Sequence, residues 1–458
     1  MLKGVTNKSI QESFDQLFSN ILLEQSQFQG IKKAEPDKKE YLDQLLKKYE
    51  LNRGRGFFYP YISTGRGHGP FSELQDGSIK YDLISGIGPN LLGHSHPLYI
   101  QANLEAATAD SIMCGNLQPY PHAIALAEKL VSLVDGSKLK HFWYAGSGSF
   151  ANDTALKMIW QKQAPKYRLI AFEGAFAGRS IATQDITQNP AYRADMPEHL
   201  KVDYIPHFNS DQSQDPKAAL KNTIDALEKI ISDHPESHCA VMMELVQGEA
   251  GFIYGDKEYY HGIAKWVKDH GLYFWVDEIQ TFGRTHKLFA FQHFELEPYV
   301  DIVTVGKALQ ACGTLYSEEL NPKPGLVSGT FNGALSTLLA GEKIIRYLDE
   351  GNFYGPIGRN KEIEEKFMNK LSQLQSNLGK EKIPYFGGIG TMISFEVGNS
   401  SKETTVKFIK TLFENGIICF MAGQNPVRVR FLLPLCLNDE HIEEIFTVIQ
   451  KTIVEVIP

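Results

Sequence analysis

The sequence lacks several features that would each assign the chain to a well-known class of protein. No stretch approaches the roughly 20 consecutive apolar residues that a membrane-spanning helix needs. The amino terminus scatters charges and amides where a secretory signal peptide has a continuous apolar core. No dense run of basic residues is present that would follow a phosphate backbone, and the formal net charge is −8. We therefore expect a soluble, cytoplasmic protein that binds neither a membrane nor nucleic acid.

The sequence also lacks the cysteine spacing of a disulfide-rich or zinc-binding protein. Its cysteines are five in number, far apart and without a CxxC pair, at Cys114, Cys239, Cys312, Cys419 and Cys436. This pattern indicates neither a disulfide framework nor a zinc site. His94 and His96 in "LGHSHP" resemble metal ligands, but no carboxylate or further histidine is spaced to complete a site. We expect no metal.

Short apolar runs alternate with helical patterns through the middle of the 458-residue chain. The runs favour strands buried on both faces, at 141–145, 168–172, 239–246, 272–277 and 300–306. Amphipathic helical patterns lie between them, as at 216–234 and 257–271. This alternation predicts an α/β fold with a mostly parallel sheet wrapped by helices.

The character of the sequence changes at both ends of this region. Residues 1–80 are less periodic and rich in Gly, Tyr and Pro, which favours an N-terminal arm and part of a small domain. Residues 81–330 form the expected large domain. Residues 331–458 begin with a long helical pattern and continue as an α+β segment, which predicts a linking helix and a small C-terminal domain.

Two carboxylates follow directly on an apolar strand pattern in "YFWVDEIQTFGRT". Asp277 and Glu278 come straight after Tyr273–Val276, which is expected to be buried. An unpaired buried carboxylate costs several kcal/mol, so the chain must place a cation or strong donors opposite it. Because ligands gather at the carboxyl ends of parallel strands, this position is also where a binding site is expected.

A second strand end carries a possible anion site. The segment "AGSGSFAN" follows a predicted strand and opens a helix, so the backbone N–H groups of Gly148 and Ser149 and the Ser149 hydroxyl can hold a phosphate dianion. Gly-Ser turns before helices are also common N-caps without any ligand, so this feature alone is weak.

A third strand end carries a lysine. Lys307 follows the apolar strand pattern of "DIVTVGKALQ" directly, where a desolvated ammonium becomes a usable amine nucleophile. A lone lysine there would more often be an exposed loop residue. A phosphate cradle, a strand-end aspartate and a strand-end lysine are together what pyridoxal phosphate requires, with the lysine forming the Schiff base and the aspartate keeping the pyridine nitrogen protonated. Asp277 would then be buried because its partner is a cofactor cation.

These motifs resemble those of the class III (ω-type) pyridoxal-phosphate-dependent aminotransferases, the group with acetylornithine, ornithine, 4-aminobutyrate and lysine ε-aminotransferases. The resemblance covers most of the chain, in the order "LQDGSIKYDLISGIGPNLLGHSHP", "SGSFAND", "GAFAGRS", "ELVQGEAG", "VDEIQTFGRT", "VGKALQ", "SGTFNGA" and "RVRFLLPL". It implies the transferase fold type I, with a large domain around a mostly parallel, seven-stranded sheet and a small α+β domain. It also implies a transaminase.

The resemblance assigns cofactor roles to individual residues. Lys307 would hold the cofactor and move the proton at the substrate carbon. Asp277 would pair with the pyridinium, Gln280 would hydrogen-bond the ring hydroxyl, and Phe176 would stack on the ring face.

The phosphate site implied by the resemblance spans two subunits. Gly148 and Ser149 would hold the phosphate, and Thr330 in "SGTF" would reach it from the neighbouring subunit. A homodimer with shared active sites is therefore expected.

Two arginines would bind substrate. Arg179 would take a carboxylate remote from the reacting amine, and Arg430 would clamp the α-carboxylate of glutamate or 2-oxoglutarate through bidentate geometry. Glu249 would pair with Arg430 and mask it for an ω-amino donor. A permanent Arg430–Glu249 ion pair remains the alternative.

The chain departs from the family pattern where Phe150, Ala177, Leu245 and Gly387 replace the usual Glu, His, Pro and Arg, and "QTFGRT" is one glycine short. None of these changes removes a catalytic group. "SGIGPN" lacks the tyrosine of ornithine aminotransferases and resembles the acetylornithine and 4-aminobutyrate branches, whereas "KALQACG" resembles the lysine branch. The expected donor is an amino acid of the acetylornithine, 4-aminobutyrate or lysine type, with 2-oxoglutarate as acceptor.

The sequence leaves two other functions open. A relative with the same cofactor could be an aminomutase or a decarboxylase, although the Arg430 and Glu249 switch serves transamination. A catalytically silent protein of the same fold is the other alternative, although it would have no chemical reason to keep Lys307, Asp277 and Thr330.

Overall fold

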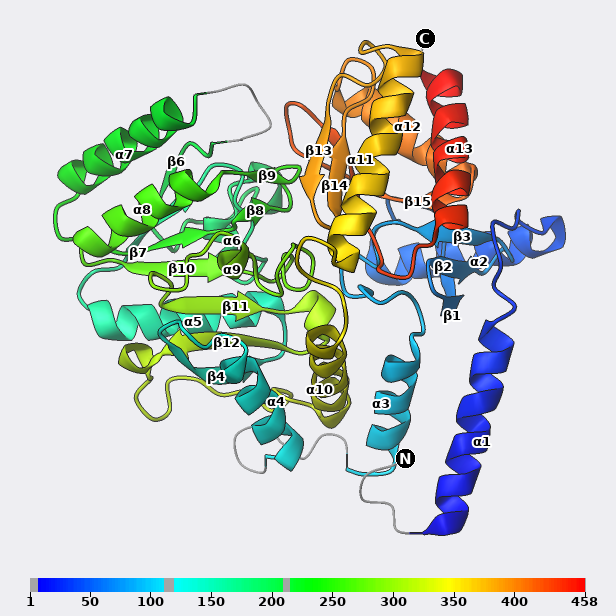
Figure 1. Cartoon of the computed structure of the whole chain (residues 1–458), viewed down its shortest axis with the longest axis horizontal. Helices are drawn as coiled ribbons and strands as arrows, with labels where there is room; N and C mark the ends of the chain where they lie inside the picture. Colours follow the sequence, from blue (N-terminus) through cyan, green and yellow to red (C-terminus); the bar gives the residue numbers. More distant parts are fainter. Residues whose placement is uncertain (1–6, 111–118, 209–214, 458) are drawn as a thin grey trace. The chain divides into compact units, whose positions relative to one another are not determined.

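The computed structural model describes residues 7–110, 119–208 and 215–457, which fall into two compact units (Figure 1). The first unit joins both ends of the chain, Met1–Leu104 and Glu362–Pro458. The second unit is the continuous segment Glu105–Lys361. Cys114 lies outside the described residues.

The second unit is built on a seven-stranded sheet. Its strands lie in the order β4 (Leu139–Ala145), β12 (Cys312–Ser317), β11 (Ile302–Val305), β10 (Tyr273–Asp277), β7 (His238–Met243), β5 (Arg168–Phe172) and β6 (Val202–Ile205). Only β12 runs antiparallel to its neighbours. The fold predicted from the sequence, a mostly parallel seven-stranded sheet in an α/β protein, is confirmed.

Helices cover this sheet because its central strands have no polar face. Every residue of β7, β10 and β11 is buried, as expected for strands covered on both sides. The helices of the unit are α4 (Pro121–Ser132), α5 (Gly148–Gln163), α6 (Thr183–Ile186), α7 (Pro216–Asp233), α8 (Lys257–Asp269), α9 (Ala290–His293) and α10 (Leu335–Glu350). A short hairpin, β8 (Val246–Gln247) with β9 (Ile253–Tyr254), follows β7.

The predicted helix boundaries agree with their capping residues. The side chain of Asp256 accepts a hydrogen bond from the Tyr259 N–H at 2.8 Å and so starts α8. Gly271, two residues after the helix ends, has φ +66°, the left-handed conformation that the sequence pattern anticipated.

The first unit contains two four-stranded sheets. One comprises β1 (Ser63–His68), β2 (Phe71–Leu74), β3 (Ile79–Asp82) and β15 (Ile417–Ile418). The other comprises β13 (Phe386–Ile389), β14 (Met392–Phe395), β17 (Arg428–Leu432) and β16 (Phe420–Ala422). Within this unit, helix α12 (Lys402–Glu414) packs on helix α13 (Asp439–Val456). The boundaries between the two units fall inside two further helices, α3 (Pro97–Ala107) and α11 (Arg359–Leu378).

Two helices near the amino terminus were not predicted. They are α1 (Lys8–Gln25) and α2 (Pro36–Arg53), drawn in blue in Figure 1. Each buries a single residue, Phe14 in α1 and Leu42 in α2. The sequence of α2 is rich in charged residues, but α1 has apolar residues at helical spacing that the sequence analysis did not use. Across the described residues, no helix combines the length and apolar character that crossing a membrane requires.

Candidate functional site

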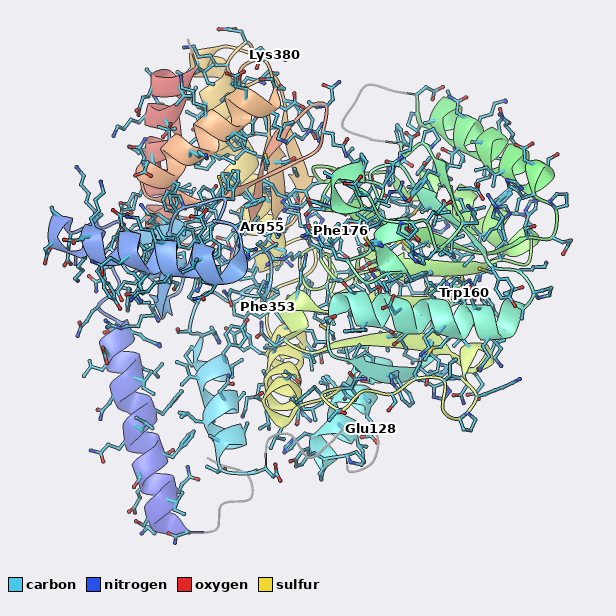
Figure 2. All side chains as sticks on the ribbon, turned by 180° about the vertical axis from the view of Figure 1, so that it is seen from behind. Arg55, Glu128, Trp160, Phe176, Phe353 and Lys380 are labelled. Atoms are coloured by element: carbon cyan, nitrogen blue, oxygen red, sulfur yellow. The ribbon has the colours of Figure 1, made fainter. Side chains whose placement is uncertain are left out.

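The site predicted from the sequence lies at one edge of the sheet in the second unit. Strands β4, β5, β7, β10 and β11 run in the same direction, so their carboxyl ends meet at this edge. Figure 2 labels Phe176, in the loop after β5, near the amino-terminal end of α5 and away from Trp160. The strand ends therefore bring together residues that are far apart in sequence.

Asp277 is buried and held by neutral donors. Its Oδ1 accepts the Ile279 N–H at 2.8 Å, and its Oδ2 accepts the Asn152 side-chain amide at 2.7 Å. Burial raises the pKa of Asp277 from an ordinary value of 3.8 to about 6, against the lowering effects of these donors and of the Lys307 charge. The carboxyl group is thus mainly ionised at neutral pH and costly to bury, which makes a cationic ligand its natural partner.

Asn152 is a site residue that the sequence analysis missed. It is fully buried on α5, and besides Asp277 its amide donates to the Ala177 carbonyl at 2.7 Å. It therefore links the end of β10 to the loop that carries Phe176. The available signal was its position one turn after Gly148, on the same face of the helix.

The turn at the start of α5, where the sequence predicts a phosphate cradle, is packed closely against the loop of Arg179. Ser147 caps the helix by accepting the Phe150 N–H, and the Ser149 hydroxyl accepts the Arg179 N–H at 3.2 Å. Gly178 has φ +126°, and a Cβ there would lie 2.3 Å from Ser149 Oγ. The loop can approach the cradle this closely only with glycine.

Lys307 follows β11 in a strained conformation. It begins a short 3₁₀ helix, Lys307–Leu309, and has φ +42°, which a residue other than glycine rarely adopts. Such strain is concentrated at functional sites, where surrounding contacts hold it. Lys307 also acts electrostatically on Asp277, lowering the pKa of that carboxyl group. The structure thus brings the predicted lysine and aspartate to one site.

Gln280 supplies an unsatisfied buried acceptor at this edge. Its Oε1 is buried and has no hydrogen-bond partner within the described part of the chain. A Cβ on Gly248 would lie 2.1 Å from this oxygen, so a side chain at position 248 would displace the Gln280 amide. An orphaned buried oxygen is costly in a folded protein, and a hydroxyl group on a ligand would satisfy it.

Two further buried carboxyl groups lie in the same region. Glu244 accepts the Phe176 N–H at 2.8 Å and the Gly248 N–H at 3.1 Å, and burial raises its pKa to about 8, with Asp277 adding to the increase. Glu278 accepts the Phe291 N–H at 2.8 Å and the Thr281 hydroxyl, and burial raises its pKa to about 7. Glu244, which the sequence analysis missed, ties the loop of Phe176 to the loop of Gly248.

Two of the three predicted substrate residues, Arg179 and Glu249, lie in this unit. The guanidinium of Arg179, an exposed residue, lies 4.2 Å from the centre of the Tyr192 ring. The Tyr192 hydroxyl donates to Glu249 Oε2 at 3.4 Å. Arg430 is buried on β17 in the first unit, and its pairing with Glu249 stays a prediction.

Three other residues considered in the sequence, Thr330, Cys312 and His94, lie at separate places in the structure. Thr330 is exposed on the second unit. Cys312 begins β12, and burial raises the pKa of its thiol, so it packs as a strand residue. His94 Nε2 lies 2.8 Å from Asp82 Oδ2. Among the described residues, no group of three or more His, Cys, Asp and Glu side chains is arranged to hold a metal ion.

The residues fit pyridoxal phosphate. Gly148 and Ser149 offer an anion cradle, Asp277 offers a buried anion for a ring cation, and Gln280 offers an unsatisfied acceptor for a ring hydroxyl. Lys307 offers the amine.

A comparison of the sequence with protein families decides the class. The profile described as aminotransferase class-III matches residues 55–453. The chain belongs to the class III aminotransferases. It is therefore a pyridoxal-phosphate-dependent transaminase, acting on small amino and oxo acids.

Curated relatives of this aminotransferase carry several names. A probable 4-aminobutyrate aminotransferase of Bacillus subtilis (strain 168) is 30% identical, over 82% of this chain and 89% of its own. An acetylornithine aminotransferase of Aquifex aeolicus is 29% identical, over 84% and 95%. An alanine/serine racemase of Pyrococcus horikoshii is 27% identical, over 92% of both chains.

A solved structure has the same fold. The lysine aminotransferase of M. tuberculosis superposes with a TM-score of 0.79 at 19% identity, over 90% of this chain and 99% of its own. At this identity the likeness concerns the fold alone, and it agrees with the fold type I transferase expected from the motifs.

Proposed function

We propose that this aminotransferase moves an amino group from an ω-amino donor, of the 4-aminobutyrate, acetylornithine or lysine type, to 2-oxoglutarate, giving glutamate. The observation that carries the proposal is the pairing of a strand-end cofactor site with an exposed arginine. Arg179 lies in the loop that packs on the start of α5, where its backbone N–H donates a hydrogen bond to the Ser149 hydroxyl. Its exposed guanidinium is available to a substrate carboxylate. The names of the relatives at 29–30% identity support the donor class.

The residues of the chain would divide the chemistry between them. Bound pyridoxal phosphate supplies an electron sink for the substrate carbon. Lys307 would hold the cofactor and carry the proton at that carbon, and Asp277 would keep the ring nitrogen protonated. Asn152 and the Ile279 N–H orient the Asp277 carboxylate. Phe176 would pack against the ring, and Gln280 would hydrogen-bond its hydroxyl group.

Arg430 would bind the α-carboxylate of glutamate and 2-oxoglutarate, and Glu249 would mask it when an ω-amino donor is present. Arg428, two residues earlier on β17, is a suitable control, because its Nε lies 3.2 Å from Glu396 in the same unit. We expect Arg430→Ala to raise the KM for 2-oxoglutarate about 10- to 100-fold, as losing a charge-assisted hydrogen bond does. The KM for the donor should change much less. Equal effects on both substrates would argue against the switch.

The chain would work as a cytoplasmic homodimer with shared active sites. Thr330, exposed in the second unit, would reach the phosphate bound by the partner subunit. We expect Thr330→Ala to weaken cofactor binding in a dimer that still forms, measured by cofactor titration alongside light scattering. Unchanged affinity would argue against a shared phosphate site.

The central experiment is a half-reaction screen on the purified holoenzyme. N-acetylornithine, ornithine, lysine, 4-aminobutyrate and glutamate are added singly while the visible cofactor band is followed. We expect one ω-amino donor to bleach the band and 2-oxoglutarate to restore it. Lys307→Ala is the control that should show neither change. If no ω-amino donor bleaches the band, the donor class is wrong.

The racemase among the relatives gives a second candidate function. A racemase exchanges the α-hydrogen of alanine or serine and needs no oxo acid. Incubation in deuterated water without 2-oxoglutarate separates the two reactions. Inversion of alanine or serine at a rate above that of amino transfer would favour the racemase.

A further inference from the structure

One tyrosine contacts three residues that the proposed function places around the substrate. Tyr192 is half-buried at the end of a 3₁₀ turn, Pro190–Tyr192. Its ring centroid lies 4.2 Å from the Arg179 guanidinium, and its hydroxyl donates to Glu249 at 3.4 Å. The centroids of the Tyr192 and Phe176 rings lie 6.1 Å apart, in an edge-to-face arrangement. No sequence motif pointed to this residue.

The turn that carries Tyr192 is fixed in place. The Asn189 side chain caps it by accepting the Ala191 N–H at 3.1 Å. One residue earlier, the Gln188 side chain accepts the Gly174 N–H at 2.6 Å, and the Gln188 N–H donates to the Ala175 carbonyl at 3.0 Å. These bonds tie the backbone of the turn to the loop of Phe176, and the contacts of the Tyr192 side chain with Glu249 and Phe176 place its ring without the help of Arg179.

Arg179 needs such support because only its backbone is held elsewhere. Its N–H is bound to Ser149 at the cradle, whereas its exposed side chain has a long flexible stem. An aromatic ring against the face of a guanidinium is attractive, and it leaves the in-plane N–H groups free to bind a carboxylate in a fork. The ring thereby orders the arginine before substrate arrives, which lowers the entropy lost on binding.

We infer that Tyr192 is a positioning residue for donor selection, which holds Arg179 ready for the carboxylate of a donor that carries its reacting amine at the other end. The inference rests on the proposed function, because it takes Arg179 as the residue that binds this carboxylate. Tyr192 acts through the arginine and touches no reacting atom.

The test measures carboxylate binding and turnover separately. Butyrate is 4-aminobutyrate without the amine, so its affinity for the holoenzyme, measured by calorimetry, reports the carboxylate site without any reaction. Turnover is then compared for 4-aminobutyrate and butylamine, which differ only in the carboxylate. The variants are Tyr192→Leu, Tyr192→Phe as the conservative control, and Arg179→Ala as the reference for complete loss.

We expect Tyr192→Leu to weaken butyrate binding and to raise the KM for 4-aminobutyrate by about 3- to 30-fold, the range of a cation–π contact. The kcat for 4-aminobutyrate and the kcat/KM for butylamine should stay within about twofold. Tyr192→Phe keeps the ring and should retain wild-type butyrate affinity. Adding Tyr192→Leu to Arg179→Ala should cost nothing further, because both act on one contact.

Three results would overturn the inference: unchanged butyrate affinity in Tyr192→Leu, an equal loss for 4-aminobutyrate and butylamine, or a loss in Tyr192→Phe as large as in Tyr192→Leu. Failure of the proposed function has a different signature. In that case no ω-amino donor bleaches the wild-type cofactor band, whatever the variants do with butyrate.

Discussion

Two buried aspartates at opposite ends of neighbouring strands in the same sheet differ in their partners. Asp301 lies just before β11, where its Oδ2 forms an ion pair with Lys268 and accepts the Phe274 N–H at 2.8 Å. Asp277 lies at the end of β10, where Ile279 and Asn152 give it hydrogen bonds from neutral groups and the charge of Lys307 also acts on it. Asp301 is therefore paired with a lysine that has no expected role in the chemistry, whereas the lysine near Asp277 is the one expected to hold the cofactor, whose ring cation Asp277 would face.

The difference separates structural from functional buried charge. A buried carboxylate with a lysine beside it needs no ligand, and its removal disturbs the fold. A buried carboxylate that is oriented by an amide and an N–H keeps its charge available, and in parallel sheets such groups gather at the carboxyl edge. The comparison predicts that changes at the Asp277 edge affect activity, whereas changes at the Asp301 edge affect stability.

The largest contrast is expected between two lysines. Lys307→Ala should lower turnover by more than about 10³-fold, because it removes both the amine that holds the cofactor and the base. Lys268→Met should leave turnover almost unchanged and lower the free energy of unfolding by about 3 kcal/mol, since it breaks the pair with Asp301. Steady-state assays and urea unfolding measure the two effects. Substantial turnover in Lys307→Ala would show that Lys307 is not the catalytic lysine, and the distinction between the two lysines would then be wrong.

The two aspartates give the next contrast. Asp277→Asn keeps the shape but removes the charge, and we expect kcat to fall by about 10²- to 10³-fold, as when a preorganised electrostatic group is lost. Asp301→Asn should keep kcat within about twofold. If both variants lose activity equally, the position at the sheet edge does not distinguish them.

The pH dependence of stability sharpens the contrast further. Burial raises the pKa of Asp277 to about 6, of Glu278 to about 7 and of Glu244 to about 8, from ordinary values of 3.8, 4.5 and 4.5. Burial lowers the pKa of His96 and His207 to about 4, so below about pH 7 these histidines oppose the carboxyl groups. Between about pH 7 and pH 8 the raised carboxyl groups dominate, so the folded apoprotein binds more protons than the unfolded chain and its stability falls as pH rises. The holoenzyme should show a shallower fall, because the cofactor ring compensates Asp277.

Urea midpoints of the apoprotein and holoenzyme at pH 5.5, 6.5, 7.5 and 8.5 measure this effect. Glu244→Gln should flatten the upper part of the apoprotein curve, since it removes the group that titrates near pH 8. Stability of the apoprotein that rises between pH 7.5 and pH 8.5 would contradict the raised carboxyl pKa values.

The smallest expected effect distinguishes two glycines. Gly178→Ala places a Cβ 2.3 Å from Ser149 Oγ at φ +126°, and should weaken cofactor binding by about 10-fold by displacing the cradle. Gly136→Ala, at φ +88° with nothing within 4 Å of the added Cβ, should cost about 1 kcal/mol of stability only. Cofactor titration of both variants measures the difference. Equal cofactor affinities of the two variants would show that Gly178 is needed only for its backbone conformation and does not affect the cofactor site.

The sequence predicted the sheet and the residues at its strand ends because both follow from local patterns. Apolar runs mark buried strands, and a polar residue directly after such a run marks a strand end, as at Asp277 and Lys307. Glu244 carries the same signal, a carboxylate directly after an apolar strand, and could have been found by the same rule. Tyr192 could not, because its turn has no periodicity and its partners come from loops.

The amino-terminal helices and the composition of the first unit were harder to predict. The α1 and α2 helices bury one residue each, so within this chain their apolar residues pack on little else. The α1 helix nevertheless carries Ile10, Phe14, Leu17 and Ile21 at helical spacing, a local signal that could have revealed it. The pairing of β3 with β15 joins Tyr81 to Ile417, more than 300 residues along the chain, and no local pattern encodes such a contact.

The charge at the sheet edge can be tested most directly by the protonation of the cofactor ring. Holoenzyme is prepared with pyridoxal phosphate labelled with ¹⁵N in the ring, and the nitrogen resonance is recorded for the wild type, Asp277→Asn and Asp301→Asn. We expect a protonated ring nitrogen in the wild type and in Asp301→Asn, and a neutral one in Asp277→Asn. A neutral nitrogen in the wild type, or a protonated one in Asp277→Asn, would contradict it.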